Sequence, residues 1–192
     1  MNIISVRNGV YTENGNINSE VHFEGLDDFI PFTASPDDSE KHGRQLFADL
    51  KAGKYGLVTP FTVTPEMLTA AKQAKHAEIN AWRDAQENGN ILFTLNDHKW
   101  DCGKASQTRL APVVAVAKSG ALPPDFFWTD ADNIDVPMTT DELTALEAAM
   151  QQNMVLQGFR IHERQRQMKE DVDKLTDYKA IQNYVVGWPK GS

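Results

Sequence analysis

The chain has 192 residues, of which 41% are hydrophobic, so it can form one large domain or two small ones with a real core. Its 27 acidic and 19 basic residues give a formal net charge of −8 without a long basic run, which argues against nonspecific binding to nucleic acid. The single cysteine excludes an internal disulfide and a cysteine-cluster metal site. Residues 1–15 do not resemble a signal peptide and no run reaches the ~18 apolar residues of a membrane span, so we expect a protein of a reducing cytoplasm with no membrane partner.

Residues 1–33 alternate apolar and polar residues over short runs, which predicts two or three small antiparallel strands. The Asn8-Gly9 and Asn14-Gly15 pairs predict hairpin turns, because both residue types tolerate a positive φ. So few strands are not stable alone, and we expect a helix, a subunit or a partner protein to cover one face of the sheet.

Two helices are predicted next. The first begins at Ser35-Pro36, where serine is a good N-cap and proline fits the first turn, and it ends at Gly53. The second begins after Thr64 and ends at Asn88-Gly89. Its alanine-rich surface indicates a connecting helix, so we expect an N-terminal β region over 1–61, a connecting helix over 62–89 and an α+β domain over 90–192.

The stretch 91–119 predicts a strand, a tight turn at Asn96-Asp97, a second strand ending at Trp100 and a helix over 103–118. Pro112 predicts that this helix is kinked or begins later than residue 103. Two short strands are expected over 126–129 and 134–136. The predicted fold class is therefore α+β, closed by one long C-terminal helix.

That last helix should begin at Thr139 or Thr140 and carries apolar residues at steps of three, four and seven. Unbroken to Val185 it would be about 69 Å long, which exceeds the diameter of a small domain. We therefore expect it to break near Gly158 or to leave the globule and meet another chain. The candidate self-association residues are Met150, Met154, Ile161 and Met168.

Three groups of residues invite a chemical interpretation. Cys102 with His98 could form a nucleophile and base, but a half-buried structural cysteine is the favoured interpretation. Asp130 opens a segment with the acid spacing of a calcium loop, yet its central glycine and final glutamate are missing, which favours a polar turn. The aromatic run 126–128 could contact a sugar, although alternating strand geometry favours the core for some of its members. We expect no catalytic residues, no cofactor and no metal.

Two parts of the chain resemble proteins of tailed bacteriophages. Residues from about Lys75 to Tyr184 resemble a phage domain of uncharacterised function, and the first half of the chain resembles the start of tail-fibre assembly proteins. The first resemblance rests on Ile91-Leu92-Phe93, Trp100-Asp101, Ser106, Leu110, Phe127-Trp128, Asp130, Asp132 and the run Met138-Thr139-Thr140-Asp141-Glu142-Leu143. The second rests on the run from Pro36 to Arg44, followed by Gly53-Lys54-Tyr55-Gly56, and Trp188-Pro189 is a weak further echo.

The resemblance implies a non-enzymatic chaperone in the host cell cytoplasm, which holds the distal C-terminal region of a trimeric tail fibre and stays on the fibre tip in some phages. Strand edges can pair with a foreign chain, so the N-terminal region is the expected contact. Its candidate partner-binding residues are Ile3, Ile4, Val6, Val10, Tyr11, Val21, Phe23 and Phe29. A homodimer through the long helix is also expected. The alternative is a structural virion component or accessory adhesin that contacts host surface glycan through Phe126, Phe127 and Trp128.

Overall fold

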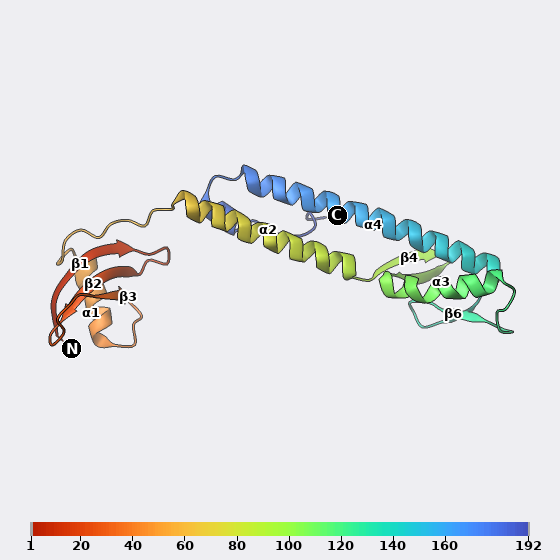
Figure 1. Ribbon diagram of the computed structural model, residues 1–192, viewed down its shortest axis with the longest axis horizontal. Helices are drawn as coiled ribbons and strands as arrows, with labels where there is room; N and C mark the ends of the chain where they lie inside the picture. Colours follow the sequence, from red (N-terminus) through yellow and green to blue (C-terminus); the bar gives the residue numbers. More distant parts are fainter. Residues whose placement is uncertain (1, 192) are drawn as a thin grey trace. The chain divides into compact units, whose positions relative to one another are not determined.

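The computed structural model describes residues 2–191 and has the predicted α+β class (Figure 1). The chain divides after Thr64 into two compact units, each with its own elements. The N-terminal unit contains β1 (Ile3–Tyr11), β2 (Ile17–Phe23), β3 (Ile30–Ala34) and α1 (Lys41–Lys51). The C-terminal unit contains α2 (Pro65–Asn88), β4 (Ile91–Leu95), β5 (His98–Cys102), α3 (Lys104–Lys118), β6 (Phe127–Thr129), β7 (Asp135–Pro137), α4 (Thr140–Lys174) and α5 (Tyr178–Gln182).

The strands of the N-terminal unit form one antiparallel sheet in the order β1-β2-β3. The β1–β2 hairpin turns at Asn14-Gly15, as predicted, with Tyr11 paired to Ile17 and Gly15 at φ 80°. The turn predicted at Asn8-Gly9 is wrong. Asn8 has φ 57° and lies inside β1, where the pairing register shifts between Arg7 and Val10. The pair therefore forms a bulge that lets β1 continue along β2.

Helix α1 covers one face of this sheet. Leu46 and Leu50 pack on the inward side chains of β2, which alternate along the strand as expected for a half-buried sheet. The core of the unit comprises Val6, Ile17, Val21, Phe23, Ala34, Leu46 and Leu50. The covering layer that we expected from a helix, a subunit or a partner is thus supplied by the chain itself.

The start of α1 lies later than predicted, because Ser35 and Asp38 cap turns rather than the helix. Ser35 accepts a hydrogen bond from the backbone N–H of Asp37 at 3.2 Å, and Asp38 accepts one from Glu40 at 2.9 Å. Helical structure begins only at Lys41. The predicted stop is confirmed, since Gly53 adopts φ 78° directly after the last turn.

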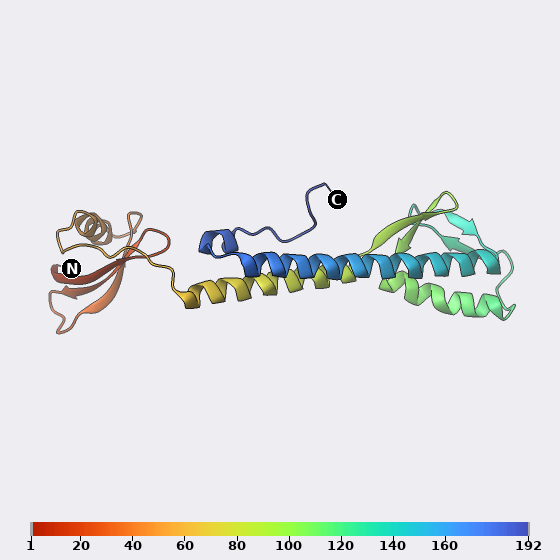
Figure 2. The ribbon, with the colours of Figure 1, turned by 90° about the horizontal axis from the view of Figure 1, so that it is seen from above.

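Helix α4 is the longest element of the C-terminal unit and has 35 residues, which correspond to about 52 Å. It begins with a reciprocal capping box in which Thr139 and Glu142 satisfy each other's backbone N–H groups. It passes Gly158 without a break, so the first of the two alternatives that we gave for this helix is wrong. Helix α2 lies beside its C-terminal half, and α3 and the β4–β5 hairpin lie beside its N-terminal half (Figure 2).

Each half of α4 has its own core. At the N-terminal half α4 packs with α3 and the β4–β5 hairpin, through Phe93, Trp100, Cys102, Leu110, Val114, Ala117, Leu143, Leu146 and Met150. At the C-terminal half it packs with α2 and α5, through Ile79, Met168, Val172 and Ile181. The segment 65–88, expected to connect two domains, is therefore an integral part of the C-terminal unit. Helix α3 spans Lys104–Lys118 with Pro112 inside, so the proline does not delay its start.

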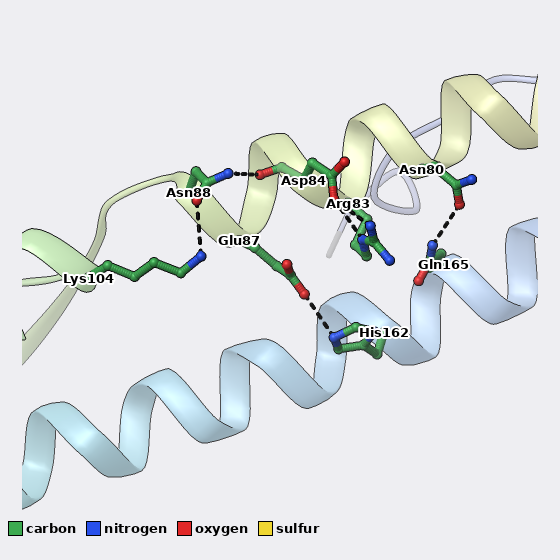
Figure 3. A network of polar contacts seen from close by, with 8 residues as sticks. All are labelled: Asn80, Arg83, Asp84, Glu87, Asn88, Lys104, His162 and Gln165. Atoms are coloured by element: carbon green, nitrogen blue, oxygen red, sulfur yellow. Dashed lines mark hydrogen bonds and ion pairs between the residues drawn. The ribbon is translucent and has the colours of Figure 1, made fainter.

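Polar contacts fix α2 along α4 (Figure 3). The buried Gln165 donates to Asn80 at 2.9 Å, and His162 pairs with Glu87 at 2.8 Å. At the end of α2, Lys104 of α3 donates to Asn88 at 3.0 Å. This amide pair favours one register, because a slip would leave the buried Gln165 without its partner.

The C-terminal tail folds back over the same helix pair. Trp188 makes an edge contact with Trp82, with ring centroids 5.2 Å apart, and its indole N–H donates to Gln86 at 2.9 Å. Arg164 donates to the carbonyl oxygen of Gly187 at 2.7 Å. The tail thus adds a third layer to the α2–α4 pair.

Candidate functional site

The eight predicted partner-binding residues are divided between the core and the surface of the N-terminal unit. Val6, Val21 and Phe23 are buried in its core, and Ile3 and Tyr11 pack partly against that core. These side chains are therefore used within the chain, because the inner face of the sheet is covered by α1.

The other three predicted residues remain accessible to different degrees. Ile4 and Val10 are 57% and 40% exposed. Phe29 is half-buried under the guanidinium group of Arg7, 4.0 Å from the ring centre, and Arg7 also pairs with Glu20 at 2.7 Å. The outer face of the sheet is thus mainly polar, with a few apolar side chains at its margins.

The two edges of the sheet differ. Near the C-terminal end of β1 the edge is paired with the segment that follows α1: the backbone N–H of Tyr11 donates to the carbonyl oxygen of Thr59, and the backbone N–H of Thr59 donates to that of Gly9, each at 2.9 Å. Among the residues that the structure describes, β3 pairs only with β2. Ile30 is the first residue of β3 and Leu26 lies in the loop between β2 and β3, and their side chains are 38% and 39% exposed. The sequence did not single out either residue, because an exposed apolar side chain and a core side chain look alike in a short run of alternating apolar and polar residues.

Cys102 and His98 are not brought together as a catalytic pair. The buried thiol of Cys102 lies 3.2 Å from the carbonyl oxygen of Met150, and burial raises its pKa. His98 stands four residues away on the same strand, and its Nδ1 lies 2.7 Å from Asp130. A thiol with a raised pKa carries little thiolate at neutral pH, which agrees with the favoured interpretation of a structural cysteine.

Asp130 organises the turn between β6 and β7. One of its oxygens accepts the backbone N–H groups of Asp132 at 2.9 Å and Ile134 at 2.8 Å, and the other meets His98. The pKa of Asp130 is lowered, first by the N–H of Ile134 and further by His98. Its carboxylate is occupied by donors from the chain, as in the polar turn that we favoured over a calcium loop.

A hollow of about 490 Å³ lies beside this turn, between α3 and β6. The expected alternation of the three aromatic residues is found: Phe126 and Trp128 pack partly against the core, whereas Phe127 is 49% exposed. The hollow also contains Asp101 and Arg109. The sequence did not indicate Asp101 or Arg109, because only the fold brings β5 and α3 next to β6.

The predicted self-association residues mostly face the interior of the C-terminal unit. Met150, Ile161 and Met168 are buried, and Met154 packs partly against the core. The regular stripe on α4 contacts α2, α3 and the β4–β5 hairpin of the same chain, so the three buried side chains are used within the chain and only the half-buried Met154 keeps some accessible surface.

In the described residues, no helix is both long and apolar enough to cross a membrane. Comparison with curated proteins and with solved structures found no match. A family model described as a domain of unknown function, DUF4376, matches residues 70–186. This span runs from α2 to the C-terminal tail and covers more than half of the chain. The chain therefore belongs to the DUF4376 family.

Proposed function

We propose that the chain is a non-enzymatic chaperone that binds the distal C-terminal region of a phage tail fibre and assists its folding and trimerisation in the host cell cytoplasm. The observation that carries the proposal is the open edge of β3 in the unit whose sequence resembles the start of tail-fibre assembly proteins. Whether the protein leaves the finished fibre or stays on its tip belongs to the same proposal.

An open strand edge suits this task because its unpaired backbone groups can extend a sheet into another chain. Trimeric β fibres depend on non-local strand pairing, which is slow and leaves edges and apolar surface exposed during folding. The exposed Leu26 and Ile30 would meet apolar side chains of the fibre next to the paired backbone. The net charge of −8 keeps such a complex soluble.

The test is co-expression with the C-terminal region of the cognate phage tail fibre, with the yield of soluble trimer as the readout. The wild-type chain should raise the yield. Ile30→Lys places a charge at the β3 edge, as natural edge strands do to prevent pairing, and should lower the yield at least about threefold.

The matched control is Leu57→Lys, which makes the same kind of change at a side chain that is 98% exposed in the same unit. It should leave the yield unchanged. If Ile30→Lys and Leu57→Lys both support as much trimer as the wild type, the β3 edge is not the fibre-binding site. If the wild type itself gives no increase, the chaperone proposal fails.

A second candidate is an accessory adhesin of the virion that contacts host glycan. The hollow beside β6 supports it, because an exposed aromatic ring next to charged side chains is a common arrangement in ligand sites. Mass spectrometry of purified virions tests the adhesin: absence of the chain from the particle excludes it, whereas a stoichiometric amount fits the adhesin and also a chaperone that stays on the fibre tip, and the co-expression experiment then separates these two.

A further inference from the structure

Three large apolar side chains near the middle of α4 are exposed to solvent. Val155, Leu156 and Phe159 are 72%, 56% and 67% exposed. They occupy positions i, i+1 and i+4, so they lie within about 100° of the helix circumference, away from the buried stripe that contains Met150 and Ile161. Clustered exposure of this kind marks an interaction surface, whereas single exposed residues do not.

The exposed side of α4 continues this cluster as a regular seam. Its positions follow steps of three and four, which is the spacing of a helix face that packs against another helix. The members, all exposed, are Ala145, Ala148, Gln152, Val155, Phe159, His162 and Arg166. The alanines at one end leave room for a long side chain of a second helix, and the large apolar residues fill the centre.

We propose that this seam binds the α4 helix of a second copy of the chain, in antiparallel orientation. Gln157 lies midway between Val155 and Phe159, so a two-fold axis there places each Val155 opposite Phe159 of the other copy. The same axis places Ala148 opposite Arg166, which pairs the smallest side chain of the seam with the longest. This proposal does not depend on the fibre-binding function.

The charges along α4 select the antiparallel orientation. Residues 160–169 carry four basic residues and one acidic residue, whereas residues 145–154 carry a single acidic residue, Glu147, and no basic one. A parallel pair would align the basic segment with its own copy. An antiparallel pair about Gln157 aligns it with the segment of Glu147, so like charges stay apart.

The size of the seam sets the expected strength. Its two large apolar side chains, Val155 and Phe159, together with the neighbouring Leu156 cannot supply the roughly 800 Å² per partner of a standard stable interface. The dimer should therefore be weak, with a Kd in the range of about 1–100 µM. Measurements on the full chain must reach about 100 µM to populate it.

The test is analytical ultracentrifugation of the full-length chain and of charge variants. Val155→Glu alone and Phe159→Lys alone should each raise the Kd at least about tenfold, since a charge then faces an apolar residue. The double variant Val155→Glu/Phe159→Lys should recover dimerisation, because the introduced glutamate of each copy then faces the introduced lysine of the other. In a parallel pair the same double variant would align like charges and could not recover it.

Val185→Glu is the matched control, because Val185 is 78% exposed in the same unit but lies outside α4. It should leave the Kd unchanged, and circular dichroism should show the same helix content for all variants. A wild-type chain that stays monomeric at about 100 µM overturns the proposal. Val155→Glu with an unchanged Kd, or a double variant that remains as weak as the single ones, overturns it as well.

Discussion

At the scale of single residues, Asp130 connects segments that are distant in the sequence. Its carboxylate holds the β6–β7 turn through two backbone N–H groups and contacts His98 on β5. The neighbouring Ala131 donates its backbone N–H to the carbonyl oxygen of Lys99 at 2.8 Å. The sequence indicated the turn, because aspartate followed by polar residues is typical of one, but it contained no sign of His98 as the partner, 32 residues away.

We predict that Asp130→Ala lowers the thermal midpoint of unfolding by about 3 °C or more, because two backbone donors lose their acceptor. Asp130→Asn keeps an acceptor oxygen and should have a smaller effect. The pKa of Asp130 is lowered in the folded chain, so its charge stabilises the fold above its ordinary pKa of 3.8 and this stabilisation is lost as the pH falls through the folded value.

The difference in unfolding midpoint between the wild type and Asp130→Asn should therefore be largest at about pH 6 and should become smaller below pH 3.8. Differential scanning calorimetry at several pH values measures it. A difference that stays constant down to about pH 2 would show that the charge of Asp130 does not contribute to stability.

At the scale of elements, local signals predicted most helices and strands, and the errors have a common cause. Asn8-Gly9 and Asn14-Gly15 are equally good turn signals, but only one of them can end β1. The chain turns at Asn14-Gly15, because β1 then pairs with β2 over a greater length. Similarly, Ser35 has the sequence of an N-cap but forms a separate turn before the helix. Where two local choices are equally good, tertiary pairing decides, and no single segment contains that information.

Helix α4 carries a glycine that its own geometry does not require. Gly158 lies in the helix interior without a positive φ, and a Cβ atom built there would meet nothing within 4 Å. We predict that Gly158→Ala stabilises the C-terminal unit by about 0.5–1 kcal/mol, because glycine is the weaker helix former. The unfolding midpoint in urea should rise accordingly.

Gly120→Ala is the matched comparison, since its Cβ would also meet open space but its φ is 73°. Alanine is strained in that left-handed conformation, so this variant should lose roughly 1 kcal/mol or more. If Gly158→Ala also lowers the urea midpoint, the open space beside Gly158 is filled by another part of the protein.

At the scale of the whole molecule, the apolar stripe of α4 predicted that the helix has a partner but not which one. The partner is α2 along one half, whereas the sequence led us to expect a second chain. A periodic stripe reports only that a face is buried, and any complementary helix satisfies it. The sequence placed the domain boundary at an alanine-rich helix over 62–89, whereas the chain divides after Thr64 and that helix belongs to the second unit.

The two units have separate cores, and we predict that they unfold separately. Leu50→Ala removes a buried side chain from the core of the N-terminal unit and should cost that unit about 2–5 kcal/mol. Met168→Ala should cost the C-terminal unit a similar amount. Hydrogen exchange of backbone amides, read by mass spectrometry, should show faster exchange in β2 only for Leu50→Ala and in α2 only for Met168→Ala, because neither core contains residues of the other unit. Faster exchange in both units after either substitution would mean that the chain folds as one cooperative body, and the β3 edge could then not be studied apart from the α2–α4 pair.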